Sequence, residues 1–275
     1  MIRLYRTTAG LWVERDNGVF ALDENFDSLI AMDDPATYLA QSTDRRPDAE
    51  HVPGLVLAPI ESQEVWGAGV TYTRSRHARV AESKESGASA FYDRVSDAER
   101  PELFFKCAGW RVCRPGEDVR VRSDARWSVP EPEIALYVNP HGRIVGWTIG
   151  NDMSARDIEG ENPLYIPQAK IYNGACALGP AMVLAPAMPS PETTIRLIVR
   201  RDEAVIFEGD TPFSRMRRDP AELVEHLYRE TLFPAGCVLL TGTGIVPPDE
   251  LSLRSGDEIS IYVDEVGILR NRVGW

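Results

Sequence analysis

From residue 55 onward the chain consists of short apolar and β-branched stretches that are separated by proline or glycine. Stretches of this length and composition are typical of β-strands. They do not alternate regularly with long amphipathic helices, so the pattern disfavours a doubly wound parallel sheet and predicts a β-rich α+β fold. The predicted strands cover residues 55–60, 65–71, 103–107, 119–122, 134–138, 144–150, 177–184, 194–200, 204–207, 238–241 and 258–263.

The first 54 residues differ from the rest and predict a small N-terminal α/β domain. Short strand-like stretches are followed by two weakly helical ones, which Asp33-Asp34-Pro35 separates because proline stops helix propagation. An acidic, proline-containing stretch at 41–53 predicts a linker. We therefore expect domains at 1–54 and 55–275. The expected elements of the small domain are strands at 2–6, 11–14 and 19–22 and helices at 26–32 and 37–41.

Two stretches of the larger domain predict helices. Asp219 can cap a helix that has Pro220 in its first turn and Glu222 at the position of a capping-box acid. The second stretch covers residues 74–83. Helices are therefore expected to be a minor part of this domain.

The charge distribution argues against a nucleic-acid-binding protein. The formal net charge is −12, and residues 21–64 hold ten acidic residues against Arg45 and Arg46. Such a surface repels phosphate backbones. No apolar stretch approaches the ~20 residues of a membrane-spanning helix, and the first residues lack the apolar segment of a signal peptide. We therefore expect a cytoplasmic protein without nucleic-acid or membrane partners.

The cysteine and glycine spacings argue against several cofactors. The four cysteines form no CxxC pair, so we expect buried thiols in a reducing compartment rather than a zinc site. Gly67-Ala68-Gly69 lacks the third glycine of a dinucleotide-binding loop, and no GxxxxGK[ST] motif occurs. Neither NAD nor ATP is implied.

Three acidic residues are expected on one face of a β-hairpin. A four-residue turn at 139–142 predicts a register that pairs Glu133 with Thr148 and places Asp152 one step beyond the partner of Glu131. Opposed residues share a sheet face, and side chains alternate with a period of two. All three carboxylates therefore project from the same face, and a slip by one residue would separate them.

Such a carboxylate cluster indicates a site for a hard cation. With few basic residues beside them, Glu131, Glu133 and Asp152 would repel one another unless a cation joined them. Oxygen-only ligands suit Mg²⁺, Mn²⁺ or Ca²⁺. The alternative is an exposed acidic strand edge, which is the usual environment of an isolated Glu-x-Glu pair. Both interpretations remain open at this point.

Other polar residues could take part in chemistry at this site. Lys170 follows the run Pro167-Gln168-Ala169, and a lysine near a bound cation loses proton affinity and can act as a base. Taken alone, it would be an ordinary surface lysine. Gly242-Thr243-Gly244 follows an apolar strand and can bring amides and a hydroxyl near an anion, although a simple tight turn has the same sequence.

At these residues the sequence resembles the fumarylacetoacetate hydrolase family. The resemblance covers about residues 55–270 and rests on the Glu131-x-Glu133 pair, the run 151–157 (Asn-Asp-Met-Ser-Ala-Arg-Asp), Lys170 and Gly242-Thr243-Gly244. It implies a mixed β-sandwich roll with a variable small N-terminal domain and, usually, a dimer. It also implies that Glu131, Glu133 and Asp152 bind the metal, and that Arg156, Lys170 and Thr243 lie in the active site.

The departures from the family pattern narrow the expected activity. Hydrolase members often carry Asn-Tyr-x-x-His, whose histidine activates water, but here Ser75 stands at the histidine position and His77 comes two residues later. Glu159 replaces a glutamine that is frequent in the hydrolases. The runs 130–133, 156–172 and 176–180 are more similar to a dehydratase branch. That resemblance gives the acid–base work to Glu102 and Lys170.

The expected activity is therefore the removal of water from a 2-keto-3-deoxy sugar acid in sugar-acid catabolism, with Mg²⁺, or alternatively Mn²⁺ or Ca²⁺, as cofactor. Lys170 is the preferred base and Glu102 the acid, with the reverse assignment open, and Arg156, Thr243 and Ser75 are expected to contact the substrate. One alternative is a hydrolase that cleaves a C–C bond in an acylpyruvate or another 1,3-diketone, for which His77 would have to reach the site. Another is a non-catalytic module that binds a cation or a small acid. A homodimer or a dimer of dimers is expected.

Overall fold

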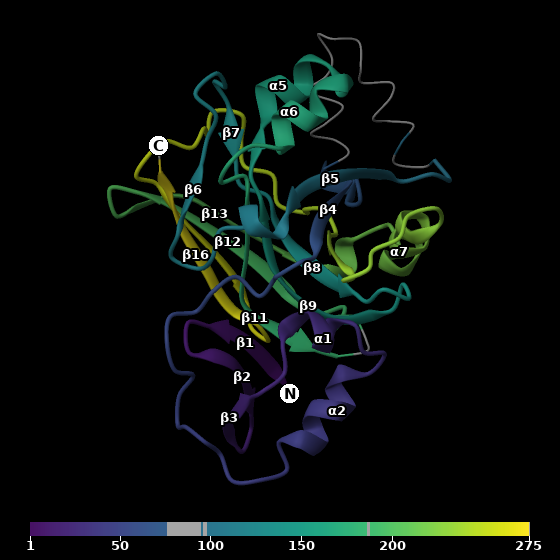
Figure 1. Ribbon diagram of the computed structural model, residues 1–275. Coiled ribbons are helices and arrows are strands. Elements are labelled where there is room, and N and C mark those ends of the chain that lie inside the picture. Colours follow the sequence, from purple (N-terminus) through teal and green to yellow (C-terminus); the bar gives the residue numbers. More distant parts are fainter. Residues whose placement is uncertain (76–94, 96–97, 186–187, 275) are drawn as a thin grey trace.

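Residues 1–75, 95, 98–185 and 188–274 are described by a computed structural model of the chain. Two β-sheets that pack face to face dominate this part (Figure 1). The β-rich α+β prediction is confirmed. The predicted helix at 74–83 and His77 lie outside the described residues, apart from residues 74 and 75.

The larger sheet has nine strands in the order β3-β2-β1-β11-β9-β8-β14-β4-β5. It is mixed, because β14 runs parallel to β4 and antiparallel to β8. Its strands are β1 (Arg3–Thr7), β2 (Gly10–Arg15), β3 (Gly18–Leu22), β4 (Glu64–Gly69), β5 (Glu102–Ala108), β8 (Pro132–Val138), β9 (Ile144–Asp152), β11 (Cys176–Leu184) and β14 (Cys237–Leu240). Residues 55–60 were expected to form a strand and instead form a loop with a single bridge between Val56 and Thr7.

The second sheet covers one face of the first. Its five strands are ordered β13-β12-β15-β16-β6, with bounds β6 (Asp118–Arg120), β12 (Thr194–Arg201), β13 (Ala204–Pro212), β15 (Glu258–Val263) and β16 (Gly267–Gly274). Ile134 and Ile149 of the large sheet belong to the same core as Leu197 and Ile261 of the small one. Each such buried side chain contributes roughly 1.5–3 kcal/mol through removal of apolar surface from water.

Short helices complete the fold. Helix α7 (Pro220–Tyr228) begins at the predicted cap, where the Asp219 side chain accepts a hydrogen bond from the Ala221 amide. Two further helices, which the strand-dominated pattern did not predict, follow the strand pair of β7 (Ser128–Val129) and β10 (Ser154–Ala155). They are α5 (Arg156–Glu161) and α6 (Ile166–Lys170), joined by η2 (Pro163–Tyr165); the remaining one-turn elements are η1 (Gly109–Arg111) and η3 (Phe213–Arg215). Within the described residues no helix is both long and apolar enough to cross a membrane.

The N-terminal residues cover the opposite face of the large sheet. Helices α1 (Phe26–Ile30) and α2 (Pro35–Ser42) contribute to a second core, in which the rings of Phe26 and Tyr137 meet edge to face with centroids 6.1 Å apart. Strand β1 pairs with β11, so the strands of residues 1–54 continue the sheet of the larger domain. The division of the chain at residue 54 stays a prediction.

The β8–β9 register differs from the expected one. Glu133 lies opposite Gly150 rather than Thr148, because the turn is longer by one residue and a β-bulge follows at Val138. The two irregularities shift the pairing by two residues, which is one full side-chain period. The amide of Asp152 consequently donates to the carbonyl of Glu131 (3.0 Å), and the three acidic residues still share one face.

Candidate active site

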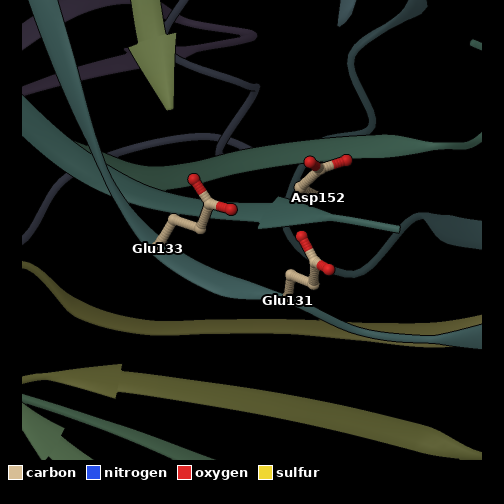
Figure 2. A group of neighbouring side chains, drawn as sticks. All are labelled: Glu131, Glu133 and Asp152. Carbon is tan, nitrogen blue, oxygen red and sulfur yellow. The ribbon is translucent and has the colours of Figure 1, made fainter. Parts of the chain in front are cut away.

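The three predicted carboxylates meet at the ends of β8 and β9. Carboxylate oxygens of Glu131, Glu133 and Asp152 lie within 4.8 Å of one another, and Figure 2 shows the three side chains as neighbours. All three residues are buried, with 5%, 2% and 1% of their surface exposed. Burial excludes the alternative of an exposed acidic strand edge.

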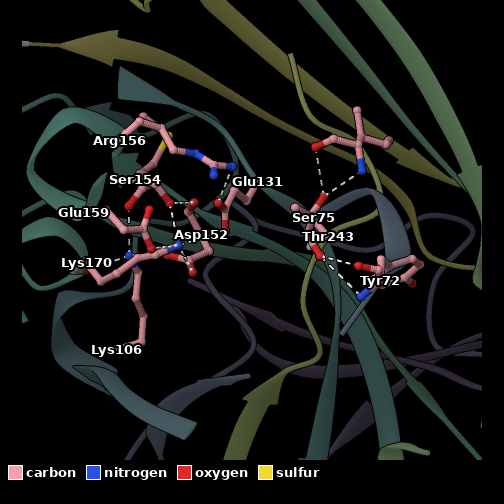
Figure 3. Close-up of polar contacts among 12 residues, drawn as sticks. Tyr72, Ser75, Lys106, Glu131, Asp152, Ser154, Arg156, Glu159, Lys170 and Thr243 are labelled. Atoms are coloured by element: carbon pink, nitrogen blue, oxygen red, sulfur yellow. Dashed lines mark hydrogen bonds and ion pairs between the residues drawn. The ribbon is translucent and has the colours of Figure 1, made fainter. Parts of the chain in front are cut away.

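Three buried cations accompany these carboxylates, which corrects the expectation of few basic neighbours. The Lys170 ammonium donates to Glu131 Oε2 (2.8 Å), Asp152 Oδ2 (2.9 Å) and the Ser154 hydroxyl (2.6 Å) (Figure 3). Arg156 Nη2 lies 2.7 Å from Glu131 Oε1. Buried charges are tolerated when they are paired and hydrogen-bonded, so the cluster explains why arginine and lysine are found in the core.

The third cation is Lys106, which was not predicted to be a site residue. It is fully buried, forms an ion pair with Asp152, and donates to the carbonyls of Met153 (2.9 Å) and Lys170 (2.6 Å). One ammonium group therefore holds a carboxylate of the cluster and the backbone of the other lysine. The sequence does contain a signal for this role, because Lys106 directly follows the apolar run Leu103-Phe104-Phe105. A lysine in such a run is expected to be buried, and a buried charge requires a partner.

Glu133 differs from its neighbours, because among the described residues no lysine or arginine forms an ion pair with it, and Lys170 acts on it only through its charge. It accepts a hydrogen bond from the Gly242 amide instead. Burial raises its pKa well above the usual range, and the charges of Asp152 and Glu131 raise it further. Gly242 has φ +91°, and a Cβ there would lie 2.0 Å from Thr71 Oγ1, so this turn requires glycine.

Glu102 lies on β5 and lines the same cavity as Lys170, Glu131 and Asp152. Strand β4 makes room for it with Gly69, where a Cβ would lie 2.1 Å from Glu102 Oε2. The ring of Phe104, also on β5, lies 5.5 Å from Lys170 Nζ. Glu102 and Lys170, the two predicted acid–base residues, therefore line the same largely enclosed cavity, and the ring of Phe104 lines it too.

Ser75 and Thr243 also line this cavity, and both are buried. The Thr243 hydroxyl bonds locally, to the amide of Ile245 at 3.1 Å and to its carbonyl at 3.2 Å. Ser75 donates to the carbonyl of Tyr72 (2.8 Å). Arg156 does not line the cavity among the described residues and lies behind Glu131, and buried Glu159 approaches Lys170 Nζ at 3.8 Å.

The donor set suits a hard divalent cation. Glu131, Glu133 and Asp152 offer only oxygen atoms, which hard cations prefer. The pKa of Glu133 is raised by burial and by two neighbouring carboxylates, and binding of either a proton or a cation relieves the repulsion among them. The residues therefore fit such an ion.

The larger sheet of a mixed β-sandwich here ends in three clustered buried carboxylates, which Lys106 of β5, Arg156 of α5 and Lys170 of α6 accompany. This fold and this donor set are those of a cation-assisted acid–base enzyme. The chain belongs to the fumarylacetoacetate hydrolase family, since residues 64–274 match the family's C-terminal domain.

Two curated proteins and one solved structure are similar over most of their length. A Saccharolobus solfataricus protein named 2-dehydro-3-deoxy-D-arabinonate dehydratase is 42% identical over 217 residues, which cover 78% of this chain and 72% of that protein. A Haloferax volcanii protein named probable 2-keto-3-deoxyxylonate dehydratase is 41% identical over 244 residues, covering 88% and 83%. The structure of 2-keto-3-deoxy-D-arabinonate dehydratase complexed with magnesium and 2,5-dioxopentanoate superposes with a TM-score of 0.81 at 33% identity, covering 99% and 98%.

Proposed function

We propose that this protein is a magnesium-dependent dehydratase that removes water from a 2-keto-3-deoxy sugar acid, such as 2-keto-3-deoxy-D-arabinonate. The main observation that supports this proposal is that Lys170 and Glu102 line one cavity together with two of the three clustered carboxylates. The names of the two similar curated proteins, and the ligands of the similar structure, support this substrate class.

Glu131, Glu133 and Asp152 would hold the magnesium ion. When bound there, the ion supplies positive charge that stabilises the enolate formed from a 2-oxo acid. Arg156 keeps Glu131 oriented through the 2.7 Å contact, and we assign it this positioning role. Thr243 and Ser75 line the cavity and orient the substrate.

We assign the proton transfers to two side chains. The contacts of Lys170 with Glu131 and Asp152 favour its ammonium form, and a cation held by these carboxylates would instead favour the neutral amine. The neutral amine takes a proton from C3, and the electron pair of that C–H bond forms the C2–C3 double bond of the enolate. Glu102 in its protonated form gives its proton to the C4 hydroxyl, which leaves as water while the electrons of the enolate form the C3–C4 double bond. Each general acid–base step contributes roughly 10²–10⁴-fold to the rate.

Proton NMR in D₂O tests both assignments at once. The magnesium-loaded protein is incubated with a panel of 2-keto-3-deoxy pentonates and hexonates, and exchange of the C3 protons is followed beside product formation. Lys170→Met should abolish both exchange and dehydration, whereas Glu102→Gln should retain exchange and lose dehydration. The opposite pattern reverses the roles of the two residues, and normal turnover by Lys170→Met contradicts the mechanism.

The same assay separates the alternative activities. An acylpyruvate in the panel would release a second acid if the protein were a hydrolase, and His77→Ala would then lose that activity. Ser75 stands at the position of the hydrolase histidine, and its hydroxyl donates to the Tyr72 carbonyl. Because the histidine that activates water is missing at this position, dehydration is favoured over hydrolysis. A non-catalytic binding module would be stabilised by magnesium without converting any of these acids.

We further propose a cytoplasmic homodimer or dimer of dimers. The four cysteines are free and buried, as expected in a reducing compartment. Val205 and Ile206 are exposed on the edge strand β13 and provide apolar surface for self-association. Light scattering during size-exclusion chromatography would give the mass of the assembly, and a monomeric mass at micromolar concentration would contradict this proposal.

A further inference from the structure

Strand β5 directs two side chains into the active-site cavity, and only one of them has a part in the proposed acid–base chemistry. Glu102 and Phe104 lie two residues apart on β5, so they project from the same face of the strand. Both line the cavity together with Lys170. Phe105 projects to the other face, where its ring meets Trp66 edge to face with centroids 5.9 Å apart. The alternation of the strand therefore gives the cavity one aromatic ring, that of Phe104.

Strand β4 leaves room for this ring. Gly67 lies opposite Phe104 in the β4–β5 pair. A Cβ at Gly67 would lie 2.5 Å from Phe104 Cζ and 2.8 Å from its Cε2, so the ring lies directly against the backbone of β4. Gly69 has the same relation to Glu102. The two glycines of β4 therefore admit, side by side, the two residues of β5 that line the cavity.

The ring of Phe104 faces the ammonium group of Lys170. Nζ lies over the ring, 5.5 Å from its centroid. This is within the ~6 Å at which the negative face of an aromatic ring attracts a cation. Lys170 is only 1% exposed, and the attraction is stronger for a cation that is removed from water. The ring is thus an apolar partner of Nζ beside its polar ones, which include Glu131, Asp152 and the Ser154 hydroxyl.

This apolar partner differs from the carboxylates in what happens to it during the reaction. Lys170 would share Glu131 and Asp152 with a bound cation, whereas the ring of Phe104 offers no oxygen atom to that cation and stays with Lys170. The amine is neutral before it takes the C3 proton and is an ammonium group afterwards. Because the ring attracts the charged form, its interaction with Nζ strengthens as the proton moves. Such an interaction raises kcat more than it lowers KM.

We propose that Phe104 is a positioning residue of the dehydration reaction: its ring holds Lys170 Nζ beside the cavity and stabilises the ammonium group that forms there. A purely steric wall would need only an apolar side chain of similar volume, so the electrostatic part of the role is what distinguishes it. The role in the reaction rests on the proposed function. The contact between the ring and the ammonium group rests on the geometry alone.

Stepwise fluorination of the ring tests the electrostatic part with little change of shape. Phenylalanines that carry one, two or three ring fluorines replace Phe104 in the full chain, because fluorine withdraws charge from the ring face and weakens its attraction for a cation. The rate at which a saturating 2-keto-3-deoxy pentonate exchanges its C3 protons in D₂O should fall with each fluorine, by about tenfold for the trifluorinated ring, with a smaller change in KM. The matched control is trifluorination of Phe105, which should leave exchange unchanged.

A double-mutant cycle on thermal stability tests the contact itself, without metal or substrate. Phe104→Leu should lower Tm by about 2–4 °C more in the wild type than in the Lys170→Met background. In the control cycle, Phe105→Leu should lower Tm equally in both backgrounds, because that ring packs on Trp66 at the other face. The fluorinated proteins leave Lys170 unchanged, so the inference stays testable if Lys170→Met does not fold.

An exchange rate that is unaffected by fluorination of Phe104, or one that falls equally when Phe105 is fluorinated, would overturn the role of Phe104 in the reaction. Additive losses of Tm in the cycle of Phe104 with Lys170 would overturn the contact. If the wild type exchanges no C3 protons at all, the proposed function fails and the role in the reaction fails with it, whereas coupling in the stability cycle would still support the contact.

Discussion

The ammonium group of Lys106 donates a 2.6 Å hydrogen bond to the backbone carbonyl of Lys170, which lies 64 residues further along the chain. The same group forms an ion pair with Asp152. Lys106 therefore sets the position of the proposed base relative to a proposed metal ligand without lining the cavity itself. This role is that of a positioning residue, and it leads to the first prediction.

Lys106→Met should lower kcat about 100-fold, because a displacement of a catalytic group by about 1 Å costs this much. It should also destabilise the protein by about 3–5 kcal/mol, because Asp152 loses a buried partner. Steady-state kinetics and magnesium affinity are measured at a temperature at which circular dichroism shows the variant folded. Lys106→Arg keeps the charge and should retain more activity, and a loss confined to stability would contradict the positioning role.

Gly69→Ala should reduce activity in the same way as loss of the Glu102 carboxyl group. The added Cβ would lie 2.1 Å from Glu102 Oε2 and 2.5 Å from Cδ, so the carboxyl group must leave its place. We expect a 10²–10⁴-fold loss of kcat at nearly unchanged thermal stability, the range of a lost general acid. In a double-mutant cycle, Gly69→Ala should cost little further activity in the Glu102→Ala background, and additive losses would show that it acts elsewhere.

Magnesium binding should release a proton from Glu133. The pKa of this carboxyl is raised well above its usual range by burial and by Asp152 and Glu131, so the metal-free protein holds the proton that the ion must replace. Affinity for magnesium should therefore increase with pH up to the raised pKa. Calorimetry in two buffers of different ionisation enthalpy measures the proton released, and Glu133→Gln is the control that should release none.

The same raised pKa fixes the sign of a stability effect in the metal-free protein. The folded state binds this proton more tightly than the unfolded chain does, so its contribution is complete below the unfolded pKa and is lost as pH rises through the folded pKa. Chelator-treated protein should unfold at a lower temperature as pH rises through that range, and magnesium should reduce the dependence. An increase of Tm with pH over that range would contradict the assignment.

Leu4→Ala tests whether residues 1–54 unfold with the rest of the chain. Leu4 is fully buried on β1, opposite Met182 of β11, and its truncation should cost about 2–5 kcal/mol. A lowered Tm of a single cooperative transition is expected, because the β1–β11 pairing joins the two parts. Leu55→Ala, at a leucine with 50% of its surface exposed, is the control and should have little effect. Two separate transitions would instead support an independent N-terminal domain.

The sequence alone determined the features that depend on local periodicity. Strand composition predicted the β-rich fold, and the acid at Asp219 followed by Pro220 predicted the start of α7. Alternation with a period of two placed Glu131, Glu133 and Asp152 on one face. The predicted β8–β9 register was wrong by two residues, but a shift of two residues keeps each side chain on the same face, so this placement was still correct. The motif resemblance identified the family for the same reason, because its signals lie in short stretches of chain. The acid–base pair that it implied remains a proposal.

Only the tertiary structure decided how distant charges are balanced. Lys106 and Lys170 reach Asp152 from β5 and α6, and such ion pairs join strands and helices whose packing no local pattern encodes. The length of the 139–142 turn, the bulge at Val138 and the continuation of the sheet into β1 likewise follow from how the sheets close around their cores. Side-chain types and their period are local properties of a chain, whereas the electrostatic field at a buried site is the sum over everything that folding brings beside it.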